Sequence, residues 1–450
     1  MHQMRPSFSE KIPAFIRELA GFLQERGIAA RPVGGAVRDL LLGREVVEWD
    51  LAVSCPPQRL MELLPGSIPT GIAHGTVTVR WKGRFIEATS YRGDRGCSDG
   101  RHPDAVVFGV SLRQDLARRD FTINAMAIDP GSDRIIDPYG GRADLARRLV
   151  RCVGDPDLRF SEDGLRVMRA VRFASVLGFS IHRRTRAAIP RSIDVFRKVS
   201  IERIRVEFMK MLSAPKPSRG VELLCRTGLL AEIIPELLAG VGFHQNRWHK
   251  SDVYRHSLKT MDAVNGDPVL RLAALLHDVS KPACIGGDGP DHTFYGHEKA
   301  GAETAGAIMR RLRFSGGEID RVTRLVALHM FSYSPDWKDG TVRRFISRAG
   351  PVLDDLLALQ RADIRARGTH IKRSLAATAA LEQRIAALSE RSLALKVGNL
   401  AINGDDIMEL FECPGGPRVG SVLAALLELV IDDPSVNTRV RLLALAREMK

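Results

Sequence analysis

The first 150 residues contain short strand-like runs of apolar and β-branched residues interrupted by polar ones. These runs cover residues 76–79, 84–89, 106–108 and 134–136. Helical stretches lie between them, notably at 36–42 and from about Phe121 onward. The mixture predicts a small domain of helices and strands at residues 1–150.

After about residue 155 the apolar residues recur at spacings of three and four, which is the period of an amphipathic helix. The pattern is clearest at 162–177, 201–212 and 270–277, and turn-rich breaks fall near 213–217, 286–290 and 414–417. We therefore predict the α+β class, with a mixed head followed by helical modules.

The composition is typical of a soluble protein and favours a polyanionic binding partner. Lys and Arg total 67 against 53 for Asp and Glu, which gives a net charge of +14 among 450 residues. The six cysteines are scattered without a Cys-x-x-Cys pair, which favours reduced thiols over a zinc ribbon or disulfide framework. No apolar run approaches the roughly 18 residues that span a bilayer, and the N-terminus lacks the apolar core of a signal peptide. We expect a cytoplasmic protein with no membrane partner.

A glycine-containing turn opens the predicted helix at 36–42. Gly34 and Gly35 allow the backbone to approach a ligand, and the start of a helix presents N–H groups to phosphate. Arg38, about one turn further on, is placed to add a bidentate contact.

Glu48 and Asp50 follow this turn. In a strand they would lie on one face, where two neighbouring carboxylates stay ionised comfortably only with a cation between them. Mg²⁺ prefers such oxygen ligands together with substrate phosphates. Glu87, in a later strand-like run, is the candidate third carboxylate from a neighbouring strand. These residues predict a magnesium-dependent phosphoryl-transfer site.

Several long motifs occur in an order that resembles one family. They are the segments 34–43, 48–50, 98–103, 118–127, 162–166 and 202–205. Their order resembles the class II tRNA nucleotidyltransferases, which are the bacterial CCA-adding enzymes and their relatives, the A-adding enzymes and bacterial poly(A) polymerases. The resemblance covers most of the chain. It implies a polymerase-β-like head with a small mixed sheet, followed by an all-α neck, body and tail.

The resemblance also implies roles for single residues. Gly35 and Arg38 would contact the incoming triphosphate, and Glu48 and Asp50 would hold Mg²⁺. The segment 118–127 would contribute further nucleotide contacts. Arg119 and Asp120 would lie at the triphosphate and ribose, and Asn124 would support them. The chain departs from the family at Glu48, where an Asp is usual, and the extra methylene shifts the carboxylate by about a bond length.

Asp163 and Arg166 lie three residues apart in the predicted helix 162–177 and so would share a face. A carboxylate accepts from the amino group of either cytosine or adenine, and a guanidinium donates to their ring acceptors. Uracil and guanine present a carbonyl in place of that amino group. The family resemblance assigns base selection to this motif, and Arg169 and Arg172 would continue the same face toward the phosphates. The segment 91–101 is interpreted as a mobile glycine-rich loop that, in the family, helps the switch from C to A addition.

A second group of residues capable of binding metal lies in the middle of the helical region. His256, His277, Asp278 and Asp363 match the four ligands of an HD domain, a metal-dependent phosphohydrolase fold appended to some CCA-adding enzymes. His and carboxylate ligands suit Ni, Mn, Fe or Zn. His297 and His329 fall where further phosphate- or metal-contacting histidines often lie. The domains are then a head at 1–150, a neck and body at 151–245, an HD domain at 246–370 and a helical tail at 371–450.

The function predicted from these features is template-independent addition of C and A from CTP and ATP to the 3′ end of tRNA. The HD site would add a phosphohydrolase activity on RNA 3′ ends or 2′,3′-cyclic phosphates. An A-adding enzyme or poly(A) polymerase on the same scaffold is the near alternative. An HD phosphohydrolase whose head only binds RNA is the alternative from another class.

Overall fold

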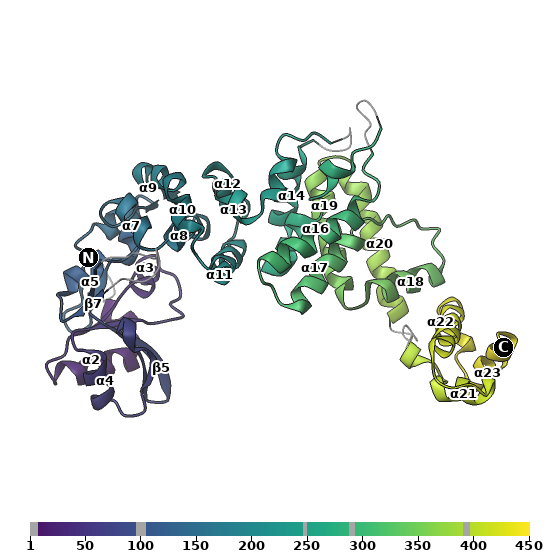
Figure 1. Cartoon of the computed structure of the whole chain (residues 1–450), viewed down its shortest axis with the longest axis horizontal. Helices are drawn as coiled ribbons and strands as arrows, with labels where there is room; N and C mark the ends of the chain where they lie inside the picture. The colour runs from purple at the N-terminus through teal and green to yellow at the C-terminus, as the bar shows by residue number, and fades with distance from the viewer. Residues whose placement is uncertain (1–7, 96–104, 246–249, 288–292, 390–396) are drawn as a thin grey trace, which may run out of the picture. The chain divides into compact units, whose positions relative to one another are not determined.

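The chain folds into two compact units, unit 1 at residues 1–233 and unit 2 at residues 234–450. A computed structural model describes residues 8–95, 105–245, 250–287, 293–389 and 397–450 (Figure 1). All strands that it describes lie in unit 1, and unit 2 is helical over its described part. The predicted α+β class, with a small sheet in the head and a helical remainder, is confirmed. The finer domain boundaries at 150, 245 and 370 stay predictions.

The main sheet of unit 1 is mixed. Its order is β1-β2-β5-β4-β3, and only the β2–β5 pair is parallel. In the central hairpin alternate side chains point into the core, so that Val79 pairs with Ile86 and Val77 with Ala88, all four buried. The five strands have these bounds: β1 Ala30–Pro32, β2 Leu51–Val53, β3 Ile68–Gly71, β4 Thr76–Trp81 and β5 Arg84–Ser90.

Three two-stranded sheets complete the β structure in the described part of unit 1. They pair β6 (Arg92–Arg95) with β7 (Ala105–Phe108), β8 (Ala127–Asp129) with β9 (Arg134–Ile136), and β10 (Leu149–Val150) with β11 (Ser180–Ile181). All four predicted strand-like runs fall within strands. The helix expected from Phe121 onward is wrong, because this segment forms only the single 3₁₀ turn η2, Thr122–Asn124.

The helices of unit 1 follow the predicted periodicity, except that the segment 162–177 is broken. Helix α7 ends at Glu162 and α8 begins at Leu165, because Asp163 is extended with φ −153° and ψ 107°. The helices are α1 Phe8–Lys11, α2 Ala14–Gln24, α3 Gly35–Leu41, α4 Pro57–Leu63, α5 Leu112–Ala117, α6 Gly141–Ala146, α7 Pro156–Glu162, α8 Leu165–Leu177, α9 Arg183–Ala188, α10 Ile193–Phe196, α11 Ile201–Leu212, α12 Ser218–Arg226 and α13 Leu229–Ile233.

Unit 2 is built around α15, whose residues from Leu270 to Leu276 are all buried. Asp267 caps its first turn, where its side chain accepts from the Val269 N–H at 2.8 Å. The last three helices share a core of their own, centred on Leu426 and Leu442. The helices are α14 Val253–Ala263, α15 Pro268–Leu276, α16 His297–Arg311, α17 Gly316–Leu328, α18 Asp339–Ala349, α19 Leu353–Arg367, α20 Ile371–Ser389, α21 Gly404–Phe411, α22 Pro417–Asp432 and α23 Arg439–Glu448.

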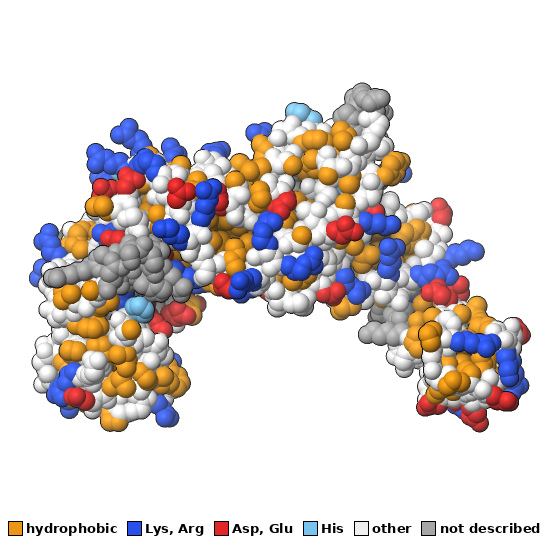
Figure 2. Space-filling model, viewed as in Figure 1, with side chains coloured by type: hydrophobic (Ala, Val, Ile, Leu, Met, Phe, Trp, Pro, Cys, Tyr) orange, Lys and Arg blue, Asp and Glu red, His pale blue; other side chains and the backbone are white. Residues whose placement is uncertain are grey.

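Basic side chains occur on the surfaces of both units and gather over α9 (Figure 2). Helix α9 exposes Arg183, Arg184 and Arg186. A membrane-crossing helix would need more length and apolar character than any helix in the described part of the chain has.

Candidate functional site

Unit 1 contains a cavity of about 520 Å³ that gathers every residue predicted for the nucleotide site. The glycine turn, the three carboxylates, the 119–124 segment and the arginines of α8 all contribute to its wall. It also includes residues that the sequence interpretation did not place there: Thr89, Arg118, Phe173 and Arg203. The mixture of clustered arginines and carboxylates suits a substrate that carries both phosphates and a metal ion.

The glycine turn brings the backbone close to an arginine. Gly34 precedes α3 with φ 69° and ψ −127°, a conformation that side chains with a Cβ rarely adopt. A Cβ at this position would lie 3.0 Å from Nη1 of Arg119. Gly34 is thus required both by its backbone angles and by the space that Arg119 occupies.

Arg38 is fixed in a network of polar side chains beneath the turn. Its guanidinium donates two bonds to Asp39, at 2.9 and 2.6 Å, and one to Oδ1 of Asn124 at 2.8 Å. The Asn124 amide donates in turn to Asp120 at 3.1 Å. This arrangement orients Arg38 in the cavity, and its predicted contact with a triphosphate stays a prediction.

The carboxylates line the cavity as predicted, but they do not lie on a buried strand. Strand β2 begins only at Leu51, and Glu48 and Asp50 lie exposed in the extended segment before it. Glu87 comes from β5, which pairs with β2. Within the described residues, only unit 2 offers three ligand atoms within 4.8 Å of one another.

The electrostatics of Asp50 indicate a place for a cation. Partial burial and the charges of Glu87 and Glu48 raise its pKa above the ordinary value, while Arg119 opposes them. Solvent moderates the effect because Asp50 faces the open cavity. A divalent ion between these carboxylates would remove the repulsion, so the residues present fit a magnesium site.

The predicted base-selecting pair lines the cavity from the break between two helices. The expectation that Asp163 and Arg166 share one helix is wrong, since Asp163 lies in the break and Arg166 in the first turn of α8. Oδ1 of Asp163 accepts from the Leu165 N–H at 3.1 Å, and Oδ2 contacts Arg203 at 3.0 Å. Arg166 donates to the side chain of Glu162 and to the Arg118 carbonyl.

Close backbone packing positions this break. A Cβ at Gly164 would lie 2.5 Å from the carbonyl oxygen of Val195, a residue of α10. Only glycine allows α8 to begin so close to that carbonyl. The position of Asp163 is therefore set by a contact between two backbones.

Two buried carboxylates hold the arginines of α8. Asp120 accepts from Arg169 at 2.8 Å, and Glu207 accepts from Arg172 at 2.5 Å. Burial alone would raise the pKa of Asp120, but Arg169 and Asn124 lower it to about 2. Arg172 also lies over the ring of Phe173, 3.8 Å from its centroid.

The sequence interpretation missed Glu207 and Asp115 as supporting residues. Asp115 is buried and holds both Arg118, at 2.8 Å, and Arg119, at 3.3 Å. Glu207 occupies a buried position on the face of α11 that also carries Ile204 and Phe208. A charged residue at an apolar position of a helical repeat was the available signal for Glu207.

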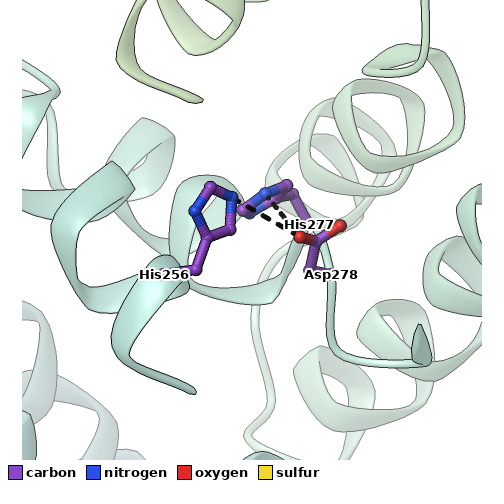
Figure 3. Close-up of side chains that lie close together, drawn as sticks. All are labelled: His256, His277 and Asp278. Atoms are coloured by element: carbon purple, nitrogen blue, oxygen red, sulfur yellow. Dashed lines mark ion pairs between the residues drawn. The ribbon is translucent and has the colours of Figure 1, made fainter. Parts of the chain in front are cut away.

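In unit 2 the predicted metal ligands converge from three helices or their ends. His256 comes from α14, His277 and Asp278 follow α15, and Asp363 lies on α19. Figure 3 shows His256, His277 and Asp278 pointing toward one another. Nε2 of His277 lies 3.2 Å from Asp278 Oδ2, and Nε2 of His256 lies 2.9 Å from Asp363 Oδ1. All four residues are buried.

The charges in this cluster favour bound cations. Burial opposes ionisation of Asp278, but His277 and Lys281 hold its pKa well below the usual range. Burial likewise opposes ionisation of Asp363, and the contacts with His256 and Arg367 lower its pKa. Two ionised buried carboxylates among imidazoles form a donor set of the kind that binds divalent transition metals.

Comparisons with known proteins match three stretches of the chain to family models. Residues 30–151 match the family described as "Poly A polymerase head domain", and 178–240 match "Probable RNA and SrmB- binding site of polymerase A". Residues 297–446 match "tRNA nucleotidyltransferase domain 2 putative". A CCA-adding enzyme from Geobacillus sp. (strain WCH70) is 34% identical over 423 residues, 93% of each chain. The chain belongs to the class II tRNA nucleotidyltransferases.

Other relatives of this nucleotidyltransferase differ in their named products. An A-adding tRNA nucleotidyltransferase from Deinococcus radiodurans is 35% identical over 88% of this chain and 90% of its own. The crystal structure of the Bacillus stearothermophilus CCA-adding enzyme in complex with CTP matches with a TM-score of 0.72 and 31% identity, over 99% of this chain and 98% of that one. The third family match begins at His297, so His256, His277 and Asp278 lie outside it.

Proposed function

We propose that this nucleotidyltransferase adds C and A nucleotides from CTP and ATP to the 3′ end of tRNA. One observation carries the proposal: a single cavity joins the carboxylates with the side chains suited to read a base. Relatives named CCA-adding enzymes, similar over nearly the whole chain, support it. The solved relative in complex with CTP supports the choice of nucleotide.

The reaction is attack by the tRNA 3′-hydroxyl on the α-phosphorus of the nucleotide. A new P–O bond forms as the hydroxyl gives up its proton to solvent, the bond from the α-phosphorus to the bridging oxygen breaks, and pyrophosphate leaves with the electron pair. Arg38, Arg119 and Arg169 bind and orient the triphosphate, and the cavity holds the reacting groups in line. Glu48, Asp50 and Glu87 would hold Mg²⁺, which when bound neutralises the charge that develops on the phosphates.

Base selection follows from the groups at the helix break. The Asp163 carboxylate accepts from the amino group of cytosine or adenine, and Arg166 donates to ring acceptors. A carbonyl facing Asp163, as in uracil or guanine, leaves a bond unmade at a cost of about 1–3 kcal/mol. Arg203, in contact with Asp163, holds the carboxylate in place.

The experiment incubates the enzyme with tRNA lacking CCA, tRNA ending in CC, or oligo(A), each with CTP or ATP. We expect CCA on the first and A on the second, with oligo(A) not extended. Extension of only the second substrate would favour an A-adding enzyme. This is the near alternative, because the Deinococcus relative is named an A-adding enzyme. Long tails on oligo(A) would favour a poly(A) polymerase.

Two variants locate the activity. Asp50→Ala is expected to abolish addition and to keep tRNA binding, whereas Asp157→Asn, an exposed aspartate of α7, should retain both. Glu48→Asp tests the departure from the family and should keep or raise the rate of addition. An inactive natural enzyme that binds tRNA would favour the alternative in which the head serves only to bind RNA.

The buried ligand set of unit 2 favours a second function, a metal-dependent phosphohydrolase of the HD type. His256, His277, Asp278 and Asp363 would hold the ion, which when bound activates water and neutralises phosphate charge. The expected substrates are a 3′-phosphate or a 2′,3′-cyclic phosphate at an RNA end. Loss of phosphate release in His277→Ala, with release retained in Asp50→Ala, is the expected result; the converse would contradict the assignment.

A further inference from the structure

Unit 2 contains a further cavity, of about 720 Å³, where α19 packs against α20 beside the segment 330–333 (Figure 1). The predicted metal ligands are not among the residues that the structure places in its wall. We call this cavity the α19–α20 pocket. The side chains that give it its character are aromatic, cationic and amide groups: Phe331, Tyr333, Gln360, Arg367, His370 and Arg373.

The described wall of the α19–α20 pocket carries positive charge and no carboxylate. Arg367 contacts Asp363 with Nη2, while its Nε is buried and has no hydrogen-bond partner among the described residues. Arg373 is an exposed residue of α20. Guanidinium groups in a concave wall that lacks an acid favour an anion, and their planar fork matches phosphate in particular.

The start of α20 contributes to the same wall, because Arg373 and Ser374 lie in its first turn. The first N–H groups of a helix have no acceptor within the helix, and the helix dipole makes this end positive. Acidic residues usually offset that charge, but the first turn of α20 has none and carries Lys372 and Arg373 instead. A bound phosphate offsets this combined positive charge.

Gln360 brings an unfilled hydrogen-bond acceptor to the pocket from α19. The residue is only 8% exposed, and its Nε2 donates to the Phe331 carbonyl oxygen at 3.3 Å. Because a carbonyl only accepts, this bond fixes which end of the amide is the oxygen. That oxygen, Oε1, is buried without a partner among the described residues. A buried acceptor without a partner lowers stability, so a ligand that supplies an N–H group recovers the lost bond.

Two aromatic rings of the wall are held in place by other rings. The centroid of Phe331 lies 4.7 Å from that of Phe345, and the centroid of Tyr333 lies 5.5 Å from that of Trp337. Both Phe331 and Tyr333 remain partly exposed. Fixed, partly exposed aromatic groups form a surface on which a flat nucleobase can pack.

We propose that the α19–α20 pocket binds a nucleotide independently of any metal ion. The phosphate lies at the start of α20 beside Arg373 and Arg367. The base packs against Phe331 and Tyr333 and donates an N–H bond to Oε1 of Gln360. Each of the four RNA bases has an N–H donor, so the ligand class is a nucleoside monophosphate, either free or as the terminal residue of an RNA.

The experiment irradiates the full-length protein with 8-azido-AMP in the presence of EDTA and maps the adduct by tandem mass spectrometry. We expect label at Phe331 or Tyr333, in the tryptic peptide 325–338. Unlabelled AMP should protect this peptide, whereas adenosine or inorganic phosphate alone should require a concentration at least about tenfold higher. Labelling should persist in Asp50→Ala, which separates the pocket from the nucleotide cavity of unit 1.

Two substitutions in the wall test the contacts. Arg373→Glu should raise the protecting concentration of AMP at least about tenfold, and Arg373→Lys should largely restore it. Gln360→Met keeps a similar shape, removes the acceptor, and should raise the concentration as well. The matched control is Arg365→Glu, an exposed arginine of α19 that is not among the described wall residues, and it should leave protection unchanged. Thermal unfolding midpoints equal to that of the natural protein show that the variants fold.

The location and the charge dependence of the label decide the result. Absence of AMP-protected label at 331–333, or equal loss in Arg373→Glu and Arg365→Glu, overturns the pocket. Unchanged protection in Gln360→Met contradicts the base contact. An RNA oligonucleotide that protects at a lower concentration than AMP identifies an RNA terminus as the source of the nucleotide, and the reverse order identifies a free nucleotide; both support the site.

Discussion

Asp120 links the head to the arginines of α8, and replacing it should show how much a buried charge stabilises unit 1. Its pKa of about 2 lies roughly two pH units below that of an unperturbed aspartate. At about 1.4 kcal/mol per unit, the ionised carboxylate stabilises the fold by about 2.5 kcal/mol at neutral pH. Asp120→Asn should lose most of this free energy of unfolding at pH 7.

The pH dependence gives the sign of the effect. Because folding lowers the pKa, the contribution is fully present above the unfolded value near 3.9 and disappears as the pH falls through about 2. Urea unfolding of the full chain, with unit 1 followed by hydrogen exchange of β4 and β5 peptides, should show a gap between natural protein and variant that narrows below pH 4.

Asp157→Asn is the matched control, because Asp157 also pairs with an arginine, Arg191, but on the surface. An exposed ion pair contributes about 0–1 kcal/mol to the free energy of unfolding, so Asp157→Asn should lower that free energy much less than Asp120→Asn does. Equal costs for the two variants would refute the reasoning. A cost for Asp120→Asn that stays constant down to pH 3 would refute it as well.

Three further predictions concern the same cavity. Asp50→Asn should raise the free energy of unfolding of the magnesium-free protein above about pH 4, because the raised pKa of Asp50 means that its ionisation destabilises the fold. Urea titrations without Mg²⁺ test this, and an unchanged unfolding midpoint would contradict it. Glu207→Ala should lower the free energy of unfolding by about 3–5 kcal/mol, since it leaves the buried charge of Arg172 without its carboxylate. A decrease below about 1 kcal/mol would show that Arg172 finds another partner. Asp163→Ala should admit UTP and GTP in single-nucleotide addition assays, and strict choice of CTP and ATP in this variant would show that Asp163 does not read the base.

Local pattern and the family resemblance together predicted residues that line one cavity, but not the backbone conformation that carries them. Glu48, Asp50 and Glu87 line one cavity as expected, yet the strand that was to carry the first two begins only at Leu51. Helical periodicity continued through Asp163, while the extended conformation there depends on a tertiary contact of Gly164 that spacing does not encode.

The supporting residues were harder to predict for the same reason. Glu207 acts through Arg172, which is distant in the sequence and reaches it only in the folded chain. Asp115 pairs with its sequence neighbours Arg118 and Arg119, but its burial depends on the fold. The polar cluster of unit 2 was easier to predict, since His277 and Asp278 follow a helix that is apolar except for Arg271, and two polar residues at the end of such a helix indicate a buried polar site. The contacts of four histidines with the two oxygens of Asp278 follow only from the three-dimensional arrangement.

The contact between Gly164 and the Val195 carbonyl has a consequence for the accuracy of nucleotide addition. A Cβ at Gly164 would lie 2.5 Å from that carbonyl oxygen, so any side chain there would displace the neighbouring Asp163. If Asp163 reads the base as proposed, discrimination between an amino group and a carbonyl would depend on the packing between α8 and α10 as well as on the identity of Asp163. Errors of addition would accordingly arise from changes that loosen this packing, even where every residue that touches the nucleotide is retained.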